Sequence, residues 1–328
     1  MSPRKRLGVV IVNYGTPALV IDCLCSLQGE IVPGQDAVVV VDNGSADGSP
    51  EFIEARIREA GWGSWARLVR SPHNNGFSAG TNMGLQEVEA EAYLLLNSDT
   101  TVKPGAIDHL LASLRARPDA GIVSPRLEAP DGSPAVNCFR KPTPIGELIK
   151  GAQTGLITRM LRRFDVPLPP ADERFECDWT GFAAVLIRAD VFREVGYLDE
   201  GYFMYFEDID FCRRAAQAGW RTLHWPTARV MHLHGKSGSV VERTEARKRR
   251  PRYYYESRSR YFAKFYGRTG LWFANLLWWA GALIALAQEV IGHRKGHICK
   301  REYLDIWTHC LRSPARPARP QPIKAKGD

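Results

Sequence analysis

Three carboxylates gather in the segment YFMYFEDIDFCRR, which runs from residue 202 to residue 214. Glu207, Asp208 and Asp210 stand directly behind aromatic and apolar side chains. An acidic residue in the first turn of a helix stabilises it by about 0.3 to 1 kcal/mol through the helix dipole. One or two acidic residues would suffice to stabilise the helix in this way, and the dipole does not explain why aromatic residues precede them. The segment therefore predicts both a helix start and a site of some kind.

Polar residues also end three apolar runs earlier in the chain. These endings are Asn13-Tyr14 after LGVVIVN, Asp42 after AVVVVD, and Asn97-Ser98-Asp99 after AYLLLN. A single ending of this kind is an ordinary turn signal. Three of them at one sheet edge predict a pocket, because parallel sheets bind ligands at the carboxyl ends of their strands.

Alternating strands and helices must position these residues. Strands are expected at 7–13, 37–42, 66–70, 92–97, 121–127 and 181–188, and helices near 17–28, 50–60, 78–90 and 104–117. Continuous apolar strands that alternate with helices are typical of βαβ units and of a mostly parallel sheet with both faces buried. We expect the acidic segment to continue as a helix to Gly219, and two short strands, WRTLHW and ARVMHLH, to follow. The predicted fold class is α/β.

Charge is divided unevenly along the 328 residues, whose formal net charge is +8. Residues 241–328 hold 19 Lys/Arg and 7 Asp/Glu, a balance of +12, so the first 240 residues hold 25 and 29, a balance of −4. A composition of 45% hydrophobic and 24% charged residues is that of a globular protein. Seven scattered cysteines without C-x-x-C spacing are typical of reduced thiols in a cytosolic protein and do not suggest a zinc site.

The basic region contains an apolar run, LWFANLLWWAGALIALA, at 271–287. At about 1.5 Å per residue the run extends about 25 Å, near the length of a membrane span. Trp272, Trp278 and Trp279, with basic residues nearby, are typical of a membrane interface. A buried packing helix or a homodimer contact is the alternative. Nucleic acid is not the expected polyanion, because the apolar run follows the basic, tyrosine-rich segment directly.

Three regions are therefore expected. They are a catalytic α/β domain at 1–240, a basic and Trp-rich helical region that associates with a membrane at 241–311, and a disordered basic tail at 312–328.

Four segments in a fixed order resemble the family 2 inverting glycosyltransferases with the GT-A fold, and within them the bacterial rhamnosyltransferase-like members. These segments are VVIVNYGTPALVIDCLCSL, VVVVDNGSADGS, HNNGFSAGTNMGL and LLLNSDT, and the resemblance covers residues 7 to about 267. It implies a nucleotide-diphospho-sugar transferase fold with a mostly parallel, Rossmann-like sheet and a divalent cation, Mg²⁺ or Mn²⁺, as cofactor.

The resemblance implies a donor site built from Asn13, Tyr14, Asp42, Asn74, Gly76, Gly80, Asn97, Ser98 and Asp99. In it, Asp42 accepts hydrogen bonds from the nucleobase or ribose, and the HNNGFSAGTN loop helps to hold the nucleotide sugar. The Asn97-Ser98-Asp99 tripeptide stands where the family has its D-x-D metal motif, so Asp99 is the main carboxylate ligand. A histidine before a Gly-x-Ser segment is a second metal ligand, either His232 or His234, and a structural role for both is the alternative.

On the acceptor side, the family has an ED-x-D segment at the place of Glu207 to Asp210. Carried over, Asp208 is the general base that takes the proton from the acceptor hydroxyl, while Glu207 and Asp210 position the acceptor or the loop. Trp179 and Gly181 match the acceptor-side wall, with a plain core position as the alternative for Trp179.

The expected function is thus an inverting, metal-dependent transfer of a sugar, with rhamnose as the leading candidate. The expected donor is dTDP-rhamnose or a UDP-sugar, and the expected acceptor is a bacterial polysaccharide or lipid-linked glycan at the cytoplasmic face of the plasma membrane. A sugar nucleotidyltransferase would carry a Gly-rich basic loop where this chain has VNYGTPAL. A non-catalytic, membrane-bound nucleotide-sugar-binding scaffold is the other alternative.

Overall fold

The structure, a computed structural model, describes residues 4–233, 239–292 and 296–311. Its strands are β1 (Lys5–Asn13), β2 (Asp36–Asp42), β3 (Ala66–Arg70), β4 (Ala90–Asn97), β5 (Thr100–Val102), β6 (Ala120–Glu128), β7 (Cys138–Phe139), β8 (Phe175–Cys177), β9 (Trp179–Thr180), β10 (Ala184–Arg188) and β11 (Arg221–His232). Its helices are α1 (Pro17–Leu27), α2 (Ser49–Glu59), α3 (Gly76–Gln86), α4 (Ala106–Ala116), α5 (Pro144–Ala152), α6 (Gly155–Met160), α7 (Ala189–Val195), α8 (Glu207–Gln217), α9 (Ser239–Glu245), α10 (Arg252–Val290) and α11 (Glu302–Asp305).

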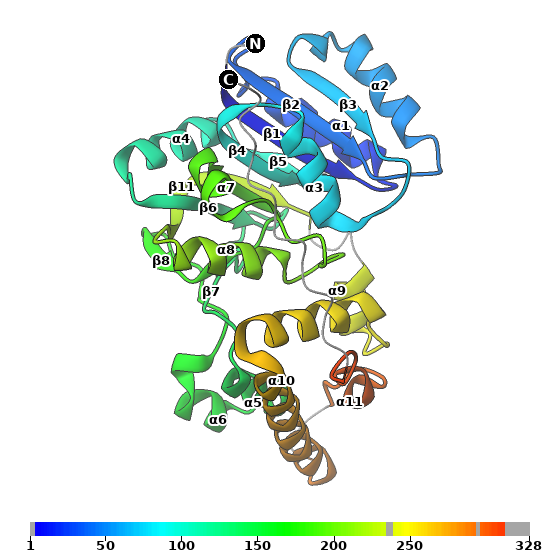
Figure 1. Cartoon of the computed structure of the whole chain (residues 1–328), viewed down its shortest axis with the longest axis vertical. Helices are drawn as coiled ribbons and strands as arrows, with labels where there is room; N and C mark the ends of the chain where they lie inside the picture. Colours follow the sequence, from blue (N-terminus) through cyan, green and yellow to red (C-terminus); the bar gives the residue numbers. More distant parts are fainter. Residues whose placement is uncertain (1–3, 234–238, 293–295, 312–328) are drawn as a thin grey trace.

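One large mixed sheet fills the upper part of the molecule (Figure 1). Its main strand order is β3-β2-β1-β4-β10-β6-β11-β5. Strands β1 to β4 pair with one another in parallel, as expected from the βαβ pattern. The second half departs from the expected parallel pattern, because β10 runs antiparallel to both β4 and β6. The α/β prediction is confirmed, and the sheet is mixed rather than mostly parallel.

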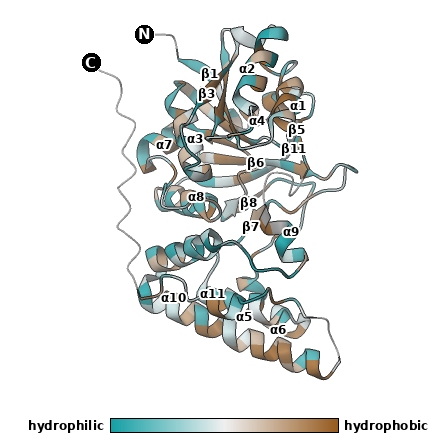
Figure 2. Ribbon diagram, turned by 90° about the vertical axis from the view of Figure 1, so that its right-hand side faces the viewer, coloured by the Kyte–Doolittle hydropathy of each residue, from teal (hydrophilic) through white to brown (hydrophobic). Residues whose placement is uncertain are grey.

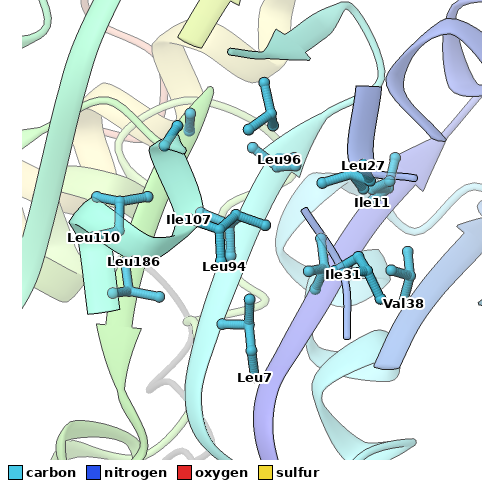
Figure 3. Close-up of a cluster of buried hydrophobic side chains, with 14 of the residues drawn as sticks. Leu7, Ile11, Leu27, Ile31, Val38, Leu94, Leu96, Ile107, Leu110 and Leu186 are labelled. Carbon is cyan, nitrogen blue, oxygen red and sulfur yellow. The ribbon is translucent and has the colours of Figure 1, made fainter. Parts of the chain in front are cut away.

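Both faces of the sheet are covered by helices, and the side-chain alternation of the strands explains how. Successive residues of a strand point to opposite faces. Leu7 and Ile11 of β1 therefore pack with α1, α2 and α4 on one face, where Leu94, Leu96, Ile107 and Leu110 complete the cluster (Figure 3). Val10 points to the other face, toward α3, α7 and α8. Burial on both sides accounts for the continuous apolar runs.

Strand β11 is a single long strand, where the sequence suggested two short ones. Its pairing with β6 shifts register between Trp225 and Arg229, so the ladder is interrupted without the strand ending. A bulge of this kind bends a strand. The result is that β11 continues past β6 and pairs antiparallel with β5, which brings its last residue, His232, beside Thr100.

The lower part of the molecule is helical and is dominated by α10 (Figures 1 and 2). Gly267 has non-helical dihedrals, with φ of 70°, and divides α10 into a first arm, Arg252 to Tyr266, and a second arm that ends at Val290. The second arm packs closely on α5. A Cβ atom on Gly281 would lie 2.4 Å from the carbonyl oxygen of Leu148, so only glycine permits this approach.

Candidate active site

The polar endings of β1 and β2 lie side by side, as the sequence predicts. Asn13 and Asp42 are register partners, and Asn13 Nδ2 donates to Asp42 Oδ1 at 2.7 Å. The backbone N–H of Ser45 donates to Asp42 Oδ2 at 2.9 Å. Both Asn13 and Asp42 are buried, whereas Tyr14 is 58% exposed at the same edge. The carboxylate of Asp42 is therefore fixed in orientation by these two hydrogen bonds.

The ending of β4 joins the same edge. Val12 of β1 is the register partner of Asn97, and Ser98 Oγ lies 3.0 Å from Thr16 Oγ1 in a hydrogen bond. Ser98 and Asp99 are buried, and Asn97 is half-buried. The three polar endings thus converge on one edge of the sheet.

The loop before α3 is tied to the ending of β2. Asn43 Nδ2 donates to Asn74 Oδ1 at 3.1 Å and to the carbonyl oxygen of Gly76 at 3.0 Å. Gly44 has φ of 77°, and a Cβ there would lie 2.7 Å from the backbone nitrogen of Asn74. These contacts hold Asn74 and Gly76 against the donor edge. Gly80 instead lies inside α3, where it lets the helix approach Val12 of the sheet.

Gly76 connects the donor loop to the segment that carries the three carboxylates. The backbone N–H of Phe77 donates to the carbonyl oxygen of Phe203 at 2.7 Å. Gly76 has φ of 89°, and a Cβ there would lie 2.2 Å from the same oxygen. A side chain is therefore excluded both by the backbone conformation and by the contact. Two segments more than a hundred residues apart in sequence meet at this glycine.

Asp99 and His232 form the candidate metal site. Asp99 Oδ1 lies 3.2 Å from His232 Nε2, and both side chains are largely buried. Their meeting follows from the antiparallel pairing of β5 with β11 and from the hydrogen bond between the N–H of Leu233 and the carbonyl oxygen of Asp99. His234 lies outside the described residues.

This donor set fits a divalent cation. A carboxylate and an imidazole are ligands that Mn²⁺ accepts, and a carboxylate alone suits Mg²⁺. Within residues 4–233, 239–292 and 296–311, no group of three or more His, Cys, Asp and Glu side chains is arranged to hold a metal. A cation at Asp99 and His232 would therefore complete its coordination with substrate oxygens and water.

The acidic segment begins α8 as predicted, and its backbone is strained just before the helix. Tyr205 and Phe206 have φ of 69° and 70°, an unfavourable region for residues with a side chain. Strain of this kind persists only where the surrounding structure holds it, and it is common in active sites. The two residues set the direction in which the first turn of α8 presents Glu207 and Asp208.

Burial gives these two carboxylates unusual acidities. Burial raises the pKa of Asp208 from its usual 3.8 to about 7. Burial also raises the pKa of Glu207 well above its usual value, and the negative charge of Asp208 raises it further. Glu207 Oε2 has no hydrogen-bond partner in the described part of the chain, which fits a protonated carboxyl. Asp208 is half-buried and so is the more accessible of the two.

Asp210 has a different environment, because its carboxylate is fully buried among cations. Arg214 Nε donates to its Oδ2 at 2.7 Å, the hydroxyl of Tyr202 lies 3.2 Å from its Oδ1, and Lys264 forms an ion pair with it. Lys264 also pairs with Asp199 at 2.9 Å. The sequence left open whether Glu207 and Asp210 position the acceptor or the loop, and their burial favours the loop.

The first arm of α10 supports the whole segment, a contact that the sequence pattern does not predict. Ser257 Oγ donates to the carbonyl oxygen of Met204 at 3.0 Å, and Arg260 pairs with Asp199 at 2.8 Å. The ring of Tyr253 stacks on that of Tyr205 with centroids 6.4 Å apart. The alternation of aromatic and basic residues in YYYESRSRYFAK was the available signal. By composition alone this segment is typical of a membrane-associating region.

Trp179 and Gly181 lie next to α8 on the far side of the acidic segment. The ring of Trp179 stacks on Phe139 with centroids 4.1 Å apart, and its Nε1 donates to the carbonyl oxygen of Arg140 at 2.9 Å. The side chain is half-buried, so one part of the ring packs and another stays accessible. A Cβ on Gly181 would lie 2.8 Å from Asn137 Oδ1. Trp179 thus packs against its neighbours and keeps part of its side chain exposed.

Comparison with known proteins adds a family and a set of relatives. The family described as "Glycosyltransferase like family 2" matches residues 3–255. An N-acetylglucosaminyl-diphospho-decaprenol L-rhamnosyltransferase of Mycobacterium tuberculosis is 29% identical over 212 residues, which are 60% of this chain and 66% of that protein. A low-salt glycan biosynthesis hexosyltransferase of Haloferax volcanii is 32% identical over 215 residues, 64% of this chain and 61% of that protein. Each alignment spans less than two thirds of the relative's own length.

Solved structures share the fold. A mannosyltransferase of Pyrobaculum calidifontis, in complex with GDP-mannose and Mn²⁺, superposes with a TM-score of 0.55 at 16% identity, covering 94% of this chain and 86% of that one. GalNAc-T7 with UDP, GalNAc and Mn²⁺ superposes with a TM-score of 0.53 at 15% identity, covering 71% and 44%. These similarities place the sheet and its helices in the GT-A fold.

Proposed function

Because the chain belongs to the glycosyltransferase-like family 2, we propose that it transfers a sugar from a nucleotide-diphosphate donor to a hydroxyl group, with inversion at the anomeric carbon. The donor binds at the carboxyl edge of β1, β2 and β4. The observation that carries the proposal is the meeting of this edge with the acidic segment through Gly76 and Phe203. That contact joins the donor loop to the segment that begins α8, and it supports the choice of a base from that segment.

Asp208 is the proposed base. Its carboxylate takes the proton of the acceptor hydroxyl while the hydroxyl oxygen bonds to the anomeric carbon on the face opposite the diphosphate. The bond from that carbon to the phosphate oxygen breaks, and the nucleoside diphosphate leaves with the electron pair. A pKa raised by burial to about 7 makes Asp208 a stronger base than a solvated aspartate. Glu207, kept protonated beside it, adds no second negative charge.

The donor-binding residues have separate tasks in this proposal. Asp42, oriented by Asn13, accepts hydrogen bonds from the base or ribose, and Tyr14 offers an exposed ring for stacking. Asp99 and His232 would hold a divalent cation, Mg²⁺ or Mn²⁺, whose positive charge would stabilise the diphosphate as it leaves. The presence of Mn²⁺ in the two solved glycosyltransferases supports this choice of cofactor.

Rhamnose from dTDP-rhamnose is the proposed transferred sugar, because a rhamnosyltransferase is among the similar proteins. The same relative, named for a decaprenol-linked substrate, supports a lipid-linked or polysaccharide acceptor here. Such an acceptor would place the enzyme at the cytoplasmic face of the plasma membrane. An accessible face of Trp179 would stack on the acceptor sugar.

A donor panel tests the function. Purified full-length protein is incubated with dTDP-rhamnose and with UDP- and GDP-sugars, each with Mg²⁺ or Mn²⁺, and nucleoside diphosphate release and thermal stabilisation are measured. We expect one nucleotide class to raise the melting temperature and to be hydrolysed slowly without acceptor. The absence of both effects for every donor and metal would refute the proposal.

The Asp208→Asn variant tests the base, with Asp190→Asn as a matched control in the exposed first turn of α7. Removing a general base typically lowers the rate by about a hundredfold to ten-thousandfold. We expect that loss in Asp208→Asn with the donor dissociation constant unchanged, and no loss in the control. Unchanged transfer by Asp208→Asn would remove it as the base.

A further inference from the structure

The second arm of α10 carries an apolar surface that stays largely exposed within the described residues 4–233, 239–292 and 296–311. We propose that this surface lies in the plane of an anionic lipid bilayer, half embedded, and that α10 does not cross the membrane. The inference deepens the membrane location that rests on the proposed function. Its binding test contains no sugar donor, so failure of docking and failure of transfer are distinguishable.

The second arm has two apolar faces. An α-helix turns by about 100° per residue, so residues three and four apart share a face. The inner face packs against α5 and the first arm and consists of Leu271, Ala274, Trp278, Gly281 and Ala285, all buried. The outward face consists of Trp272, Phe273, Leu276, Leu283, Ile284 and Leu286, which are between 38% and 56% exposed.

An apolar outward face is unusual for a helix at the edge of a soluble domain, where polar residues normally face water. No Asp, Glu, Lys or Arg occurs between Arg268 and Glu289 in the sequence. Figure 2 shows hydrophobic residues along this arm of α10 and in α6, at the end of the molecule away from the sheet. Large exposed apolar patches mark interaction surfaces. The surface therefore has a partner.

Positive charge at one end of the outward face and elsewhere in the lower part of the molecule indicates what this partner is. Arg268 lines a groove together with Trp272, Phe273 and Leu276 at one end of the face. In α6, which lies in the same lower part of the molecule (Figure 1), and in the turn after it, Leu156 and Met160 are exposed near three exposed arginines, Arg159, Arg162 and Arg163. Apolar side chains together with nearby cations fit an anionic bilayer, because lipid tails cover the apolar side chains and anionic headgroups pair with the cations. A second copy would bring the same positive charge and be repelled.

The inner face shows why the helix lies along the membrane. Asn275 is fully buried there and accepts a hydrogen bond from Arg258 Nη1 at 2.6 Å, and Arg258 in turn pairs with Glu147 of α5 at 2.7 Å. By length and apolar composition α10 could cross a bilayer. If α10 crossed the bilayer, α5 and the pair of Arg258 with Glu147 would either enter the lipid or lose their contacts with α10. Both outcomes are energetically costly. Lying flat, the outward face enters the headgroup boundary and the inner face stays packed.

Vesicle flotation tests the docking surface with full-length protein. The probes are vesicles of phosphatidylcholine alone and of phosphatidylcholine mixed with phosphatidylglycerol. We expect binding to the mixed vesicles that weakens with added salt, and much weaker binding to the neutral ones. The double variant Leu276→Glu, Leu283→Glu should bind at least about tenfold more weakly, because two inserted side chains are replaced by charges. Phe52→Glu is the matched control, since Phe52 is 46% exposed on α2, at the far end of the molecule.

Several results would overturn the inference. Wild-type protein that floats with neither vesicle, or a double variant that binds as the wild type does, removes the outward face as a lipid surface. A dimer in light scattering that the double variant converts to a monomer would assign the face to a second copy. Circular dichroism must show the same melting temperature for both glutamate variants, as expected for exposed sites.

The in-plane orientation has its own test. Ala280 is exposed near the middle of the second arm, so an Ala280→Trp variant reports the depth of the helix centre. With lipids brominated near the headgroup or near the chain end, we expect the added fluorescence to be quenched more by the headgroup-proximal bromine. A shallow position agrees with insertion of about 5 to 10 Å for an interfacial helix. Stronger quenching by the chain-end bromine would mean a spanning helix.

Discussion

The pH dependence of transfer should separate Asp208 from Glu207. The two carboxylates are adjacent, and burial raises the pKa of both. The pKa of Glu207 is raised further by the charge of Asp208, so Asp208 ionises first, while Glu207 is still protonated. The Glu207→Gln variant replaces a protonated carboxyl with a neutral group of the same shape. It should therefore leave the ionisation of Asp208 almost unchanged.

The size of the effect follows from the pKa of Asp208. With a pKa of about 7, the carboxylate is ionised in only about 1% of molecules at a pH of about 5, so kcat/KM should fall about a hundredfold from its plateau. A solvated aspartate with the usual value of 3.8 would still be more than nine-tenths ionised there, and kcat/KM would barely change.

The assay is kcat/KM for transfer from a fixed donor between pH values of about 5 and 9, for wild type, Glu207→Gln and Asp208→Asn. We expect the same acid limb in wild type and Glu207→Gln, and activity near background in Asp208→Asn. If the midpoint of the acid limb of kcat/KM moves to a lower pH by a full unit in Glu207→Gln, the charge of Glu207 raises the pKa of Asp208 in the wild type. Loss of activity in Glu207→Gln with activity kept in Asp208→Asn would reverse the assignment of the base.

The same pKa values make a statement about stability. A carboxyl whose pKa is raised in the folded state favours folding below its unfolded pKa, and this contribution is lost as pH rises through the folded pKa. For Asp208 that window lies between about 4 and the folded value of about 7. The melting temperature of Asp208→Asn should therefore exceed that of the wild type most clearly at pH values above the folded pKa of about 7, where the wild type buries an ionised Asp208. A gap that instead widens toward acid pH would contradict the burial of an ionised Asp208.

Further perturbations address the support of the site and its cation. Lys264→Met leaves the buried carboxylates of Asp199 and Asp210 with fewer cations. We therefore expect kcat to fall about tenfold and the melting temperature to fall by a few degrees. Lys264→Arg should restore both quantities, and a normal kcat in Lys264→Met would exclude a positioning role. Gly76→Ala should destabilise the protein and abolish donor binding, because its Cβ would lie 2.2 Å from the carbonyl oxygen of Phe203. Gly29→Ala is the control, since a Cβ there would have no atom within 4 Å. It should change neither the melting temperature nor the donor titration. His232→Ala should raise the Mn²⁺ concentration for half-maximal donor binding about tenfold or more; an unchanged midpoint would remove it as a ligand.

The support for the strained turn shows most clearly what a sequence pattern leaves out. Tyr205 and Phe206 are ordinary aromatic residues in the sequence, and nothing local demands their positive φ. The conformation is stable because Tyr253, Ser257 and Lys264 of α10 contact the segment 202–214 from far along the chain, Lys264 through its ion pair with Asp210. Long-range contacts of this kind have no sequence period, so the sequence pattern alone predicts a separate region at 241–311.

The sequence by itself determined the elements and the edge on which the site lies. Apolar runs that end in Asn13, Asp42 and Asn97 predict buried strands with polar carboxyl ends, because strand burial and turn formation depend on local residue types. Only the tertiary structure decided the antiparallel insertion of β10, the meeting of Asp99 with His232, and the contact of Gly76 with the acidic segment. Each of these joins distant parts of the chain through pairing and packing, and such contacts are fixed by the whole fold and not by any local pattern.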